Sequence, residues 1–463
     1  MLYISTRGSA PALEFDEVLL SGLACDGGLY VPAVWPQISS AEQLNMRNLT
    51  YSELACRVMH PFVGETIGEE DFAAIVDDAY SGFSDEQVAP LRELDNGLWL
   101  LELFHGPTLA FKDVALQLLG RLFDYMLYRR GERITIVGAT SGDTGSAAIE
   151  ACKGSESVDI FILHPAGRVT EVQRRQMTTV VSDNVHNIAI NGSFDDCQDL
   201  VKSCFNDAPF RRQMRLSAVN SINWARIMAQ IVYYFWAALK LGAPSRSTTF
   251  VVPTGNFGNI FAGYGGYLMG LPINKLVVAS NQNDILVRFF ERNAMEMEEV
   301  VETVSPSMDI QISSNFERLL FDLLDRKASD VAKAMNIFRK TGELLVPNHA
   351  WEKSRKLFEA FKVDDETTLK TIAMIYGEKN ILIDPHTAVG IAGATPKSRG
   401  PLAPIVSLAT AHPAKFPDAA KRAIGQAPLL PSPLANLYER KECFTKLPNE
   451  LSTLQDFIRA KKR

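Results

Sequence analysis

The stretch ITIVGATSGDTGSAA, residues 134–148, runs from a short apolar segment through a turn of small residues into a helix-forming sequence. The same order of strand, turn and helix returns after the apolar run at 249–252. Two further apolar runs, at 276–279 and 405–408, lead into polar loops. This alternation predicts a parallel sheet wrapped by helices, with the four turns gathered on one face at the carboxyl ends of the strands.

The length of the chain sets the scale of this prediction. With 463 residues the chain is too long for one compact core, and we expect about two or three domains. The predicted parts are an N-terminal, mainly helical segment over 1–95, a smaller α/β domain over 96–230 and a larger α/β domain over 231–463. Helical patterns such as residues 51–60 are typical of the first part, which carries little recognisable chemistry.

The composition argues against several classes of function. A formal net charge of -7 argues against a nucleic-acid surface. The most apolar segment, 227–241, is shorter than the roughly 20 residues that a bilayer requires, and it predicts a buried helix rather than a membrane span. No secretory signal is visible, so we expect a cytoplasmic protein. The six scattered cysteines and the spacing of the histidines predict neither disulfides nor a metal site.

The motif HGPTLAFKD, residues 105–113, contains the first catalytic candidate. Lys112 opens a run whose apolar residues recur at helical spacing. A lysine at the start of a helix is usually a solvated surface charge. Burial among the apolar residues of the motif would instead lower the pKa of the amine and free it to form an imine. The residues alone leave both interpretations open.

Two glycine-rich turns are candidates for anion binding. In residues 138–148, small residues allow a close approach of the backbone, and the hydroxyls of Ser141 and Thr144 suit a carboxylate or a phosphate. In PTGNFGN, residues 253–259, two glycines precede a predicted helix whose N–H groups and dipole attract phosphate. This second turn has neither the P-loop lysine nor the dinucleotide register. An ordinary capped turn between a strand and a helix explains residues 138–148 equally well. A glycine-rich turn that binds no ligand explains residues 253–259 equally well.

Two further stretches carry polar groups. In NSINWAR, residues 220–226, Asn220 and Ser221 are either helix caps or ligand contacts. Arg226 is either a surface charge or, if it turns inward, a bidentate contact for a phosphate. In SLATAHPAKF, residues 407–416, Thr410 ends a predicted strand, where its hydroxyl could reach a heteroaromatic nitrogen. His412 and Lys415 of the same stretch receive no role.

Taken in order, HGPTLAFKD, ATSGDTG, NSINWARI, GNFGN and ATAHPAKF closely resemble the motifs of the threonine synthase family, in its long-chain bacterial and fungal type. YISTRG at 3–8 and DGGLYVP at 26–32 are similar to the N-terminal part of that family, so the resemblance spans nearly the whole chain. It implies a fold-type II pyridoxal-phosphate enzyme, similar to the tryptophan synthase β-subunit, with two open, twisted α/β domains around the cofactor.

The resemblance also implies roles for particular residues. Lys112 would carry pyridoxal 5'-phosphate on its amine and act as the catalytic base, and Asp143 would lie near the ring hydroxyl of the cofactor. Thr410 would face the pyridine nitrogen. The residues that would hold the cofactor phosphate are Gly255, Asn256, Phe257, Gly258 and Asn259. Those that would bind the substrate are Ser141, Thr144, Asn220, Ser221 and Arg226.

The reaction that the resemblance implies is a β,γ-replacement that converts O-phospho-L-homoserine and water into L-threonine and phosphate, the last step of threonine biosynthesis. Such an enzyme is a carbon–oxygen lyase acting on phosphates. Residue types do not fix the regiochemistry, so two alternatives stay open: an eliminating dehydratase or phospho-lyase acting on a hydroxy or phosphohydroxy amino acid, and a non-catalytic cofactor-binding sensor. The expected partner is a small-molecule substrate, with neither nucleic acid nor membrane, and the chain is either a monomer or a homodimer.

Overall fold

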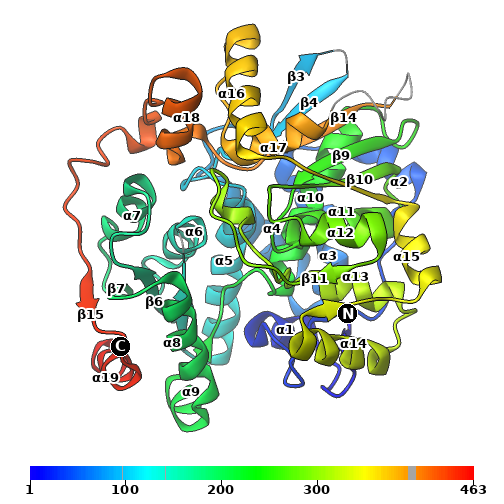
Figure 1. The fold of residues 1–463 in the computed structure, drawn as a ribbon. Helices are drawn as coiled ribbons and strands as arrows, with labels where there is room; N and C mark the ends of the chain where they lie inside the picture. Colours follow the sequence, from blue (N-terminus) through cyan, green and yellow to red (C-terminus); the bar gives the residue numbers. More distant parts are fainter. Residues whose placement is uncertain (96, 141, 395–402) are drawn as a thin grey trace.

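Two separate β-sheets organise the protein (Figure 1). The computed structural model describes residues 1–95, 97–140, 142–394 and 403–463. In Figure 1 the smaller sheet lies beside α6, α7 and α8, and the larger sheet lies beside α10, α11 and α12. Helix α5 runs between these two groups in this view. The alternation of strands and helices that the sequence predicts is therefore confirmed, but it builds two sheets.

The larger sheet has six strands in the order β13-β10-β9-β14-β4-β3. Its strands are β3 (Leu91–Asp95), β4 (Leu98–Glu102), β9 (Thr248–Pro253), β10 (Ile273–Ser280), β13 (Phe358–Lys362) and β14 (Ile405–Ala409). All neighbours are parallel except β3, which runs antiparallel to β4 at the edge. In the centre, Ser407 of β14 pairs with Leu100 of β4 and with Val251 of β9. These strands are largely buried on both faces, as expected for a parallel sheet covered by helices.

The smaller sheet has five parallel strands in the order β15-β7-β6-β5-β8. They are β5 (Ile134–Ala139), β6 (Val158–Pro165), β7 (Val185–Ile190), β8 (Leu216–Ser217) and β15 (Thr445–Leu447). The strand predicted at 134–137 is thus confirmed, but it lies in a different sheet from the strands at 249–252, 276–279 and 405–408. The expectation that all four turns follow strands of one sheet is wrong, because hydrogen-bond pairing between distant strands is not visible in a local pattern.

Sheet membership does not follow the predicted ranges of residues. Strand β4 falls in the range 96–230 but pairs with β14 of the larger sheet. Strand β15 and the last helix fall in the range 231–463, yet β15 pairs with β7 of the smaller sheet. The chain therefore crosses between the sheets more often than three consecutive ranges imply, and the domain borders themselves stay a prediction.

Helices form most of the ordered elements in residues 1–95. The elements are β1 (Tyr3–Ser5), α1 (Phe15–Ser21), β2 (Tyr30–Pro32), α2 (Ser40–Met46), α3 (Tyr51–Val63), the short 3-10 helix η1 (Gly64–Thr66) and α4 (Glu69–Tyr80). Helix α3 begins at a capping box in which Thr50 and Glu53 satisfy each other's backbone N–H groups. Its buried face packs against α10. The N-terminal segment thereby covers part of the central core.

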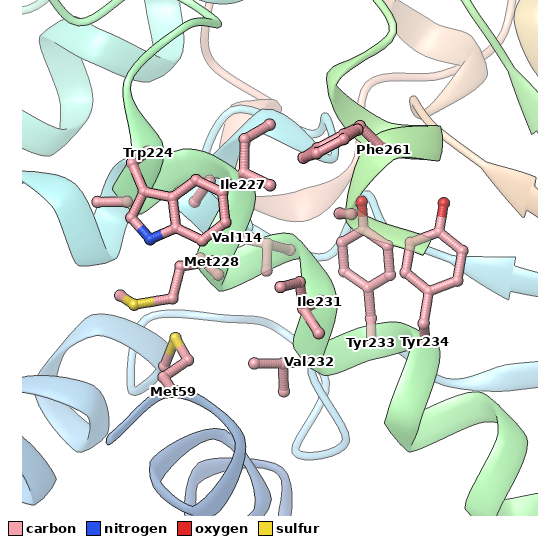
Figure 2. Packing of buried hydrophobic residues seen from close by; sticks show 14 of the residues in the cluster. Met59, Val114, Trp224, Ile227, Met228, Ile231, Val232, Tyr233, Tyr234 and Phe261 are labelled. Carbon is pink, nitrogen blue, oxygen red and sulfur yellow. The ribbon is translucent and has the colours of Figure 1, made fainter. Parts of the chain in front are cut away.

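Helix α10 (Trp224–Lys240) lies at the centre of that core (Figure 2). Every residue from Trp224 to Leu239 is buried, which confirms the buried helix predicted at 227–241. A helix that is apolar on nearly all sides is stable only when other elements surround it. Figure 2 shows Met59 of α3 and Phe261 beside its side chains. Helix α3 of the N-terminal segment, together with α5 and α11, thus surrounds α10.

The remaining helices complete the layers. They are α5 (Lys112–Arg130), α6 (Asp143–Cys152), α7 (Glu171–Thr178), α8 (Phe194–Asn206), α9 (Ala208–Met214), α11 (Gly258–Leu268), α12 (Ile285–Arg292), α13 (Phe316–Leu323), α14 (Ala328–Thr341), α15 (Asn348–Arg355), α16 (Asp365–Lys379), α17 (Pro385–Gly393), α18 (Pro417–Ile424) and α19 (Leu451–Lys461). A short pairing joins β11 (Met295–Glu296) to β12 (Glu343–Leu344), and 3-10 turns occur at η2 (Pro306–Met308), η4 (Pro413–Lys415) and η5 (Ser432–Leu434). Among the described residues, no helix is both long and apolar enough to cross a membrane.

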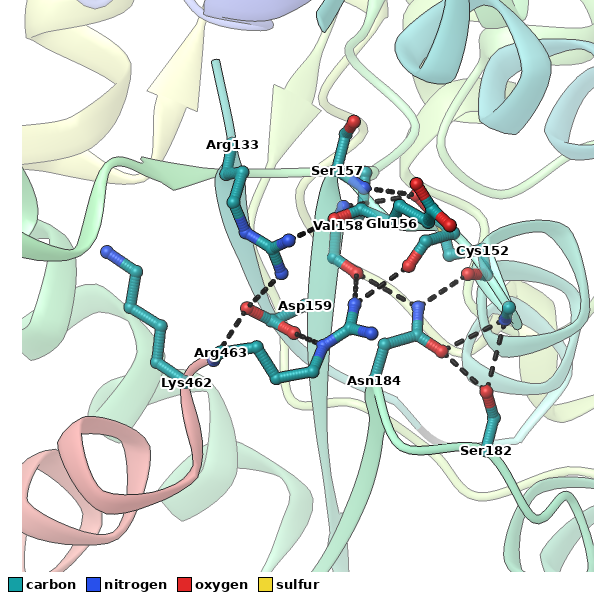
Figure 3. Close-up of polar contacts among 12 residues, drawn as sticks. Arg133, Cys152, Glu156, Ser157, Val158, Asp159, Ser182, Asn184, Lys462 and Arg463 are labelled. Carbon is teal, nitrogen blue, oxygen red and sulfur yellow. Dashed lines mark hydrogen bonds and ion pairs between the residues drawn. The ribbon is translucent and has the colours of Figure 1, made fainter. Parts of the chain in front are cut away.

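The C-terminus is fixed to the smaller sheet by a polar cluster (Figure 3). The Arg463 guanidinium donates from Nε to Oδ1 of Asp159 at 2.7 Å and from Nη2 to the carbonyl of Ser155 at 2.7 Å. Asp159 is buried on β6, and Arg133 also contacts its carboxylate at 3.4 Å. Because a buried carboxylate needs such partners, the last residue of the chain is part of the folded domain.

Candidate active site

Lys112 is the first residue of α5, and a short bridge brings it next to the end of β14. Residues 103–111 leave β4 and pass Leu109, which has a positive φ of 62°. Ala110 pairs with Ala411, and the N–H of Phe111 donates to the carbonyl of Thr410 at 2.8 Å. Lys112 and Thr410 therefore lie side by side, although they are far apart in the sequence.

The amine of Lys112 lies in a nearly closed environment. Its side chain is 13% exposed, and Nζ lies 3.5 Å from Oδ2 of Asp143. Burial lowers the pKa of Lys112, and the positive charges of Lys415 and Arg226 lower it further against the opposing effect of Asp143. An amine with a lowered pKa is more often unprotonated, and the unprotonated form is the nucleophile and base. Of the two interpretations of this lysine, the structure favours the desolvated one.

Asp143 opens α6, directly after a turn that only glycine fits. Gly142 has a φ of 146°, and a Cβ atom there would lie 2.5 Å from the side chain of Gln173. That close approach lets Gln173 Nε2 donate to Oδ1 of Asp143 at 2.8 Å. Lys415 Nζ contacts the same oxygen at 3.0 Å. Burial raises the pKa of Asp143, but the ammonium groups of Lys415 and then Lys112 outweigh burial and hold it well below its usual range.

The loop Gly255–Asn259 leads from β9 into α11 and presents the start of that helix. Phe257 adopts the left-handed conformation with a φ of 62° and caps the helix, so Gly258 and Asn259 occupy its first turn. The first N–H groups of a helix have no partner within it and attract anions. A Cβ atom on Gly255 would lie 2.6 Å from the carbonyl oxygen of Ser307, so this position requires glycine. The loop is thus shaped as an anion cradle.

Asn259 carries a buried donor that no group among the described residues satisfies. Its Oδ1 accepts hydrogen bonds from the hydroxyls of Tyr233 at 2.6 Å and Tyr234 at 2.9 Å, which fixes the orientation of the amide. Its Nδ2 is buried and has no hydrogen-bond partner within the described chain. An unsatisfied buried donor is costly unless a ligand or water accepts from it.

Arg226 turns inward, as one of its two interpretations requires. It is 3% exposed, and burial lowers its pKa to about 10. Its Nη1 donates to the carbonyl of Val219 at 3.0 Å, whereas Nε is buried and unpaired within the described residues. None of the ion pairs of the described chain includes it, and its charge acts on Lys112. A buried guanidinium without a carboxylate partner is a candidate binding site for an anion.

The other predicted site residues differ in their surroundings. Ser221 lies 3.5 Å from the hydroxyl of Ser314, and Asn315 donates both to the Ser221 carbonyl and to the Asn256 carbonyl, which ties the two anion-binding stretches together. Asn220 is exposed, and Asn223 rather than Asn220 or Ser221 caps α10. Thr144 is half-buried in the first turn of α6. Ser141 lies outside the described residues.

Two side chains at this site received no role from the sequence: Lys415 and Gln173. Lys415 is fully buried and also donates to the carbonyl of Thr108 at 2.6 Å. It belongs to the stretch 407–416 that attracted attention for Thr410, but nothing in that stretch indicates that its amine reaches Asp143. Gln173 lies in α7, outside every motif. Only the packing of the two sheets brings these groups together.

The donor set fits pyridoxal phosphate. The cofactor requires a reactive amine, an anion cradle for its phosphate and polar groups around its ring. Lys112 supplies a buried amine, the Gly255–Asn259 loop supplies the cradle with the unpaired Asn259 amide, and Thr410 and Asp143 flank the lysine. These groups do not include Arg226, which is a second candidate anion-binding site.

Comparisons with known proteins agree with this chemistry. Three family models match: "Threonine synthase N terminus" over residues 2–80, "Pyridoxal-phosphate dependent enzyme" over residues 84–410 and "Threonine synthase, C-terminal" over residues 387–458. A threonine synthase of Pseudomonas aeruginosa is 58% identical over 99% of this chain and 98% of its own length.

Solved structures extend the similarity to three dimensions. The structure of a threonine synthase from Brucella melitensis with pyridoxal phosphate bound has a TM-score of 0.98 and 53% identity, and covers 100% of both chains. The yeast threonine synthase structure has a TM-score of 0.94 and 40% identity, covering 99% of this chain and 98% of that one. The similarity therefore includes the N-terminal segment and both sheets.

Proposed function

This chain belongs to the threonine synthase family, and we propose on that premise that it converts O-phospho-L-homoserine and water into L-threonine and inorganic phosphate. It is a fold-type II enzyme that depends on pyridoxal phosphate. The observation that best supports a phosphorylated substrate is a second candidate anion-binding site, at Arg226. Arg226 is buried and has no carboxylate partner among the described residues, and its charge acts on Lys112, whereas the cofactor phosphate is assigned to the loop at the start of α11.

In this proposal each cofactor contact comes from a residue already described. Lys112 carries the cofactor, the Gly255–Asn259 loop binds its phosphate, Thr410 faces its ring nitrogen and Asp143 lies beside its ring hydroxyl. When bound, pyridoxal phosphate supplies an electron sink that stabilises negative charge on the carbon atoms of the substrate. The Thr410 hydroxyl, unlike a carboxylate, does not force the ring nitrogen to stay protonated, so proton movement depends more on Lys112.

Lys112 is the base of the proposed reaction. With the substrate bound to the cofactor, its Nζ atom would remove a proton from Cα and then one from Cβ. The lowered pKa supports this role because burial favours the unprotonated amine, which is the form that accepts a proton. The C–O bond at Cγ would then break, with its electron pair leaving on phosphate, and a proton would return to Cγ, which becomes the methyl group. The oxygen of water would bond to Cβ as the water loses a proton, and Cα would regain a proton. Lys112 finally displaces the amine of threonine and releases the product.

Arg226 anchors the leaving group. Its free Nε and the charge of its guanidinium suit the substrate phosphate, with Asn220 and Ser221 at the edge of the same stretch. Thr144, in the first turn of α6, is assigned to the substrate phosphate or carboxylate, and so is Ser141, which lies outside the described residues. Holding the phosphate in place limits the geometry in which Cα and Cβ meet the Lys112 amine. We place the reaction in the cytoplasm, with the enzyme acting as a monomer or a homodimer.

The test follows both products at once. Purified wild type, Lys112→Ala and the control Lys153→Ala are mixed with O-phosphohomoserine and pyridoxal phosphate, and threonine and phosphate are quantified. Lys153 is an exposed lysine at the end of α6, so its loss leaves the site intact. We expect equal amounts of threonine and phosphate from the wild type and the control, and at least about a thousandfold less from Lys112→Ala.

The remaining outcomes separate the alternatives. Phosphate together with a keto acid, and no threonine, would identify an eliminating lyase. Cofactor absorbance that responds to the substrate without any release of phosphate would identify a non-catalytic sensor.

A further inference from the structure

Lys415 lies at the site, fully buried, and it is absent from the machinery described above. It ends the 3-10 turn η4 (Pro413–Lys415) that follows β14. Its ammonium group donates to the Thr108 carbonyl at 2.6 Å and lies 3.0 Å from Oδ1 of Asp143. A buried ammonium ion loses its hydration and persists only with partners such as these.

Asp143 is shared between two lysines. Its Oδ1 receives Lys415 and the amide of Gln173, and its Oδ2 lies 3.5 Å from Lys112. The stronger contacts occupy the oxygen that faces away from Lys112. The carboxylate is therefore held in one orientation whether or not Lys112 is protonated. Lys112 contacts only Oδ2, at a longer distance than those of Lys415 and Gln173 to Oδ1.

The charges that face this group come from every element packed around it. Lys112 experiences Asp143, Lys415 and Arg226. Lys415 also acts on Asp113, whose pKa burial raises to about 6 although Thr108 and Lys415 lower it. His412, whose pKa burial lowers to about 4, contributes no charge near neutral pH. The groups that act directly on the Lys112 amine are therefore two cations and one anion, and Lys415 is one of the two cations.

We propose that Lys415 is a positioning residue that holds Asp143 as an oriented carboxylate and disfavours protonation of the Lys112 nitrogen. The inference rests on the proposed role of Lys112 as carrier of the cofactor, but not on which product the enzyme makes. Lys415 acts in two ways in the same direction. As a cation it disfavours a second positive charge on Lys112, and by occupying Oδ1 it prevents Asp143 from pairing fully with Lys112.

The test uses the holoenzyme and an optical readout. The visible absorbance of the bound cofactor changes with the protonation of the nitrogen that joins it to Lys112, so a pH titration of that absorbance has a measurable midpoint. Lys415→Gln keeps a hydrogen-bond donor for Asp143 and Thr108 but removes the charge. We expect its midpoint to rise by about one pH unit, and the acid limb of the kcat/KM profile to move with it.

Two controls accompany this variant. Lys421→Gln, the same change at an exposed residue of α18, should leave the midpoint where it is in the wild type. Lys415→Arg keeps the charge and should return the midpoint most of the way to the wild-type value. A midpoint that stays unchanged in Lys415→Gln, with wild-type thermal stability, would overturn the proposal and leave Lys415 as a packing residue.

A second pair of variants covers the case in which Lys415→Gln does not fold. Asp143→Asn removes the anion and should lower the midpoint, and Asp143→Asn/Lys415→Gln removes both partners and should raise it again. Equal midpoints in these two variants would contradict the proposal. Because the titration requires the cofactor on Lys112 and not the formation of threonine, failure of the proposed function would appear separately, as missing product with an intact titration.

Discussion

Two buried arginines, Arg226 and Arg318, occupy the same position in two different helices and have different surroundings. Each is the third residue of its helix, in α10 and in α13, and exposures of 3% and 0% show that both are buried. Burial lowers the pKa of both, to about 10 for Arg226 and to about 9 for Arg318. Near the N-terminus of a helix a cation also gains nothing from the helix dipole.

Their hydrogen bonds set them apart. Arg318 donates from Nε to the Tyr30 carbonyl at 3.0 Å, from Nη2 to the Ile222 carbonyl at 2.6 Å and from Nη1 to Oδ1 of Asn315. Arg226 donates to one carbonyl only, and its Nε is unpaired within the described chain. A guanidinium whose donors all bond to the protein has a structural role, whereas one with unused buried donors can donate hydrogen bonds to a ligand.

The same substitution at both positions gives the largest expected effect at Arg318. Arg318→Met keeps an unbranched chain but leaves two buried acceptors and one part-buried acceptor without donors, so we expect the free energy of unfolding to fall by about 4 kcal/mol. Urea denaturation followed by circular dichroism measures this loss. If Arg318→Met unfolds at the same urea concentration as the wild type, the distinction between the two arginines fails.

Arg226→Met should affect catalysis rather than stability. It removes one hydrogen bond and one uncompensated buried charge, so we expect the free energy of unfolding to change by less than about 1 kcal/mol. The value of kcat/KM for O-phosphohomoserine should fall about a hundredfold, or about 2.7 kcal/mol, because the substrate phosphate loses its guanidinium partner. Steady-state kinetics test the expected fall in kcat/KM, and the same urea titration tests the expected small change in the free energy of unfolding. An unchanged kcat/KM would remove Arg226 from the substrate site.

Inorganic phosphate should stabilise the holoenzyme through Arg226. In the proposed holoenzyme the cofactor phosphate occupies the loop Gly255–Asn259, so we expect added phosphate to bind only at Arg226. At ten times its dissociation constant it should raise the free energy of unfolding by about 1.4 kcal/mol. Thermal denaturation of the wild type and of Arg226→Met, with and without phosphate, tests this expectation. Equal stabilisation of both proteins would place the phosphate somewhere else.

The smallest expected effect comes from Arg226→Lys. Lysine keeps the positive charge but lacks the planar fork that contacts two phosphate oxygens, so kcat/KM should fall about fivefold, or about 1 kcal/mol. Kinetics with the wild type, Arg226→Lys and Arg226→Met should give a graded series. A fall as large as that of Arg226→Met would show that the fork, rather than the charge, carries the interaction.

Much of the fold could be predicted from local patterns. The apolar runs at 249–252 and 405–408 predict strands, and the small residues around 138–148 predict the turn before α6, because backbone preferences depend on near neighbours. The assignment of strands to sheets could not be predicted in the same way. Strand β5 lies in one sheet and β14 in the other, and β15 returns from the end of the chain to pair with β7.

The candidate site shows the same division. The motif around Lys112 indicates a helix that opens with a lysine, but the residues before it allow either a solvated or a buried amine. The structure favours the buried one through the bridge between Ala110 and Ala411. The local sequences around Arg226 and Arg318 do not show which of the two arginines is free to bind a ligand and which has a structural role. Lys415 and Gln173 acquire partners only because α6, α7 and η4 meet.

The sequence by itself determined which segments form strands and helices, where glycine-rich turns precede helices and which family the motifs resemble, because each of these depends on residues close together in the chain. Only the tertiary structure decided which amine is desolvated, which guanidinium keeps unused donors and which carboxylate two lysines share. Those properties arise from burial and from contacts between distant segments, since an ionisable group changes its pKa and its hydrogen bonds only when folding replaces the water around it.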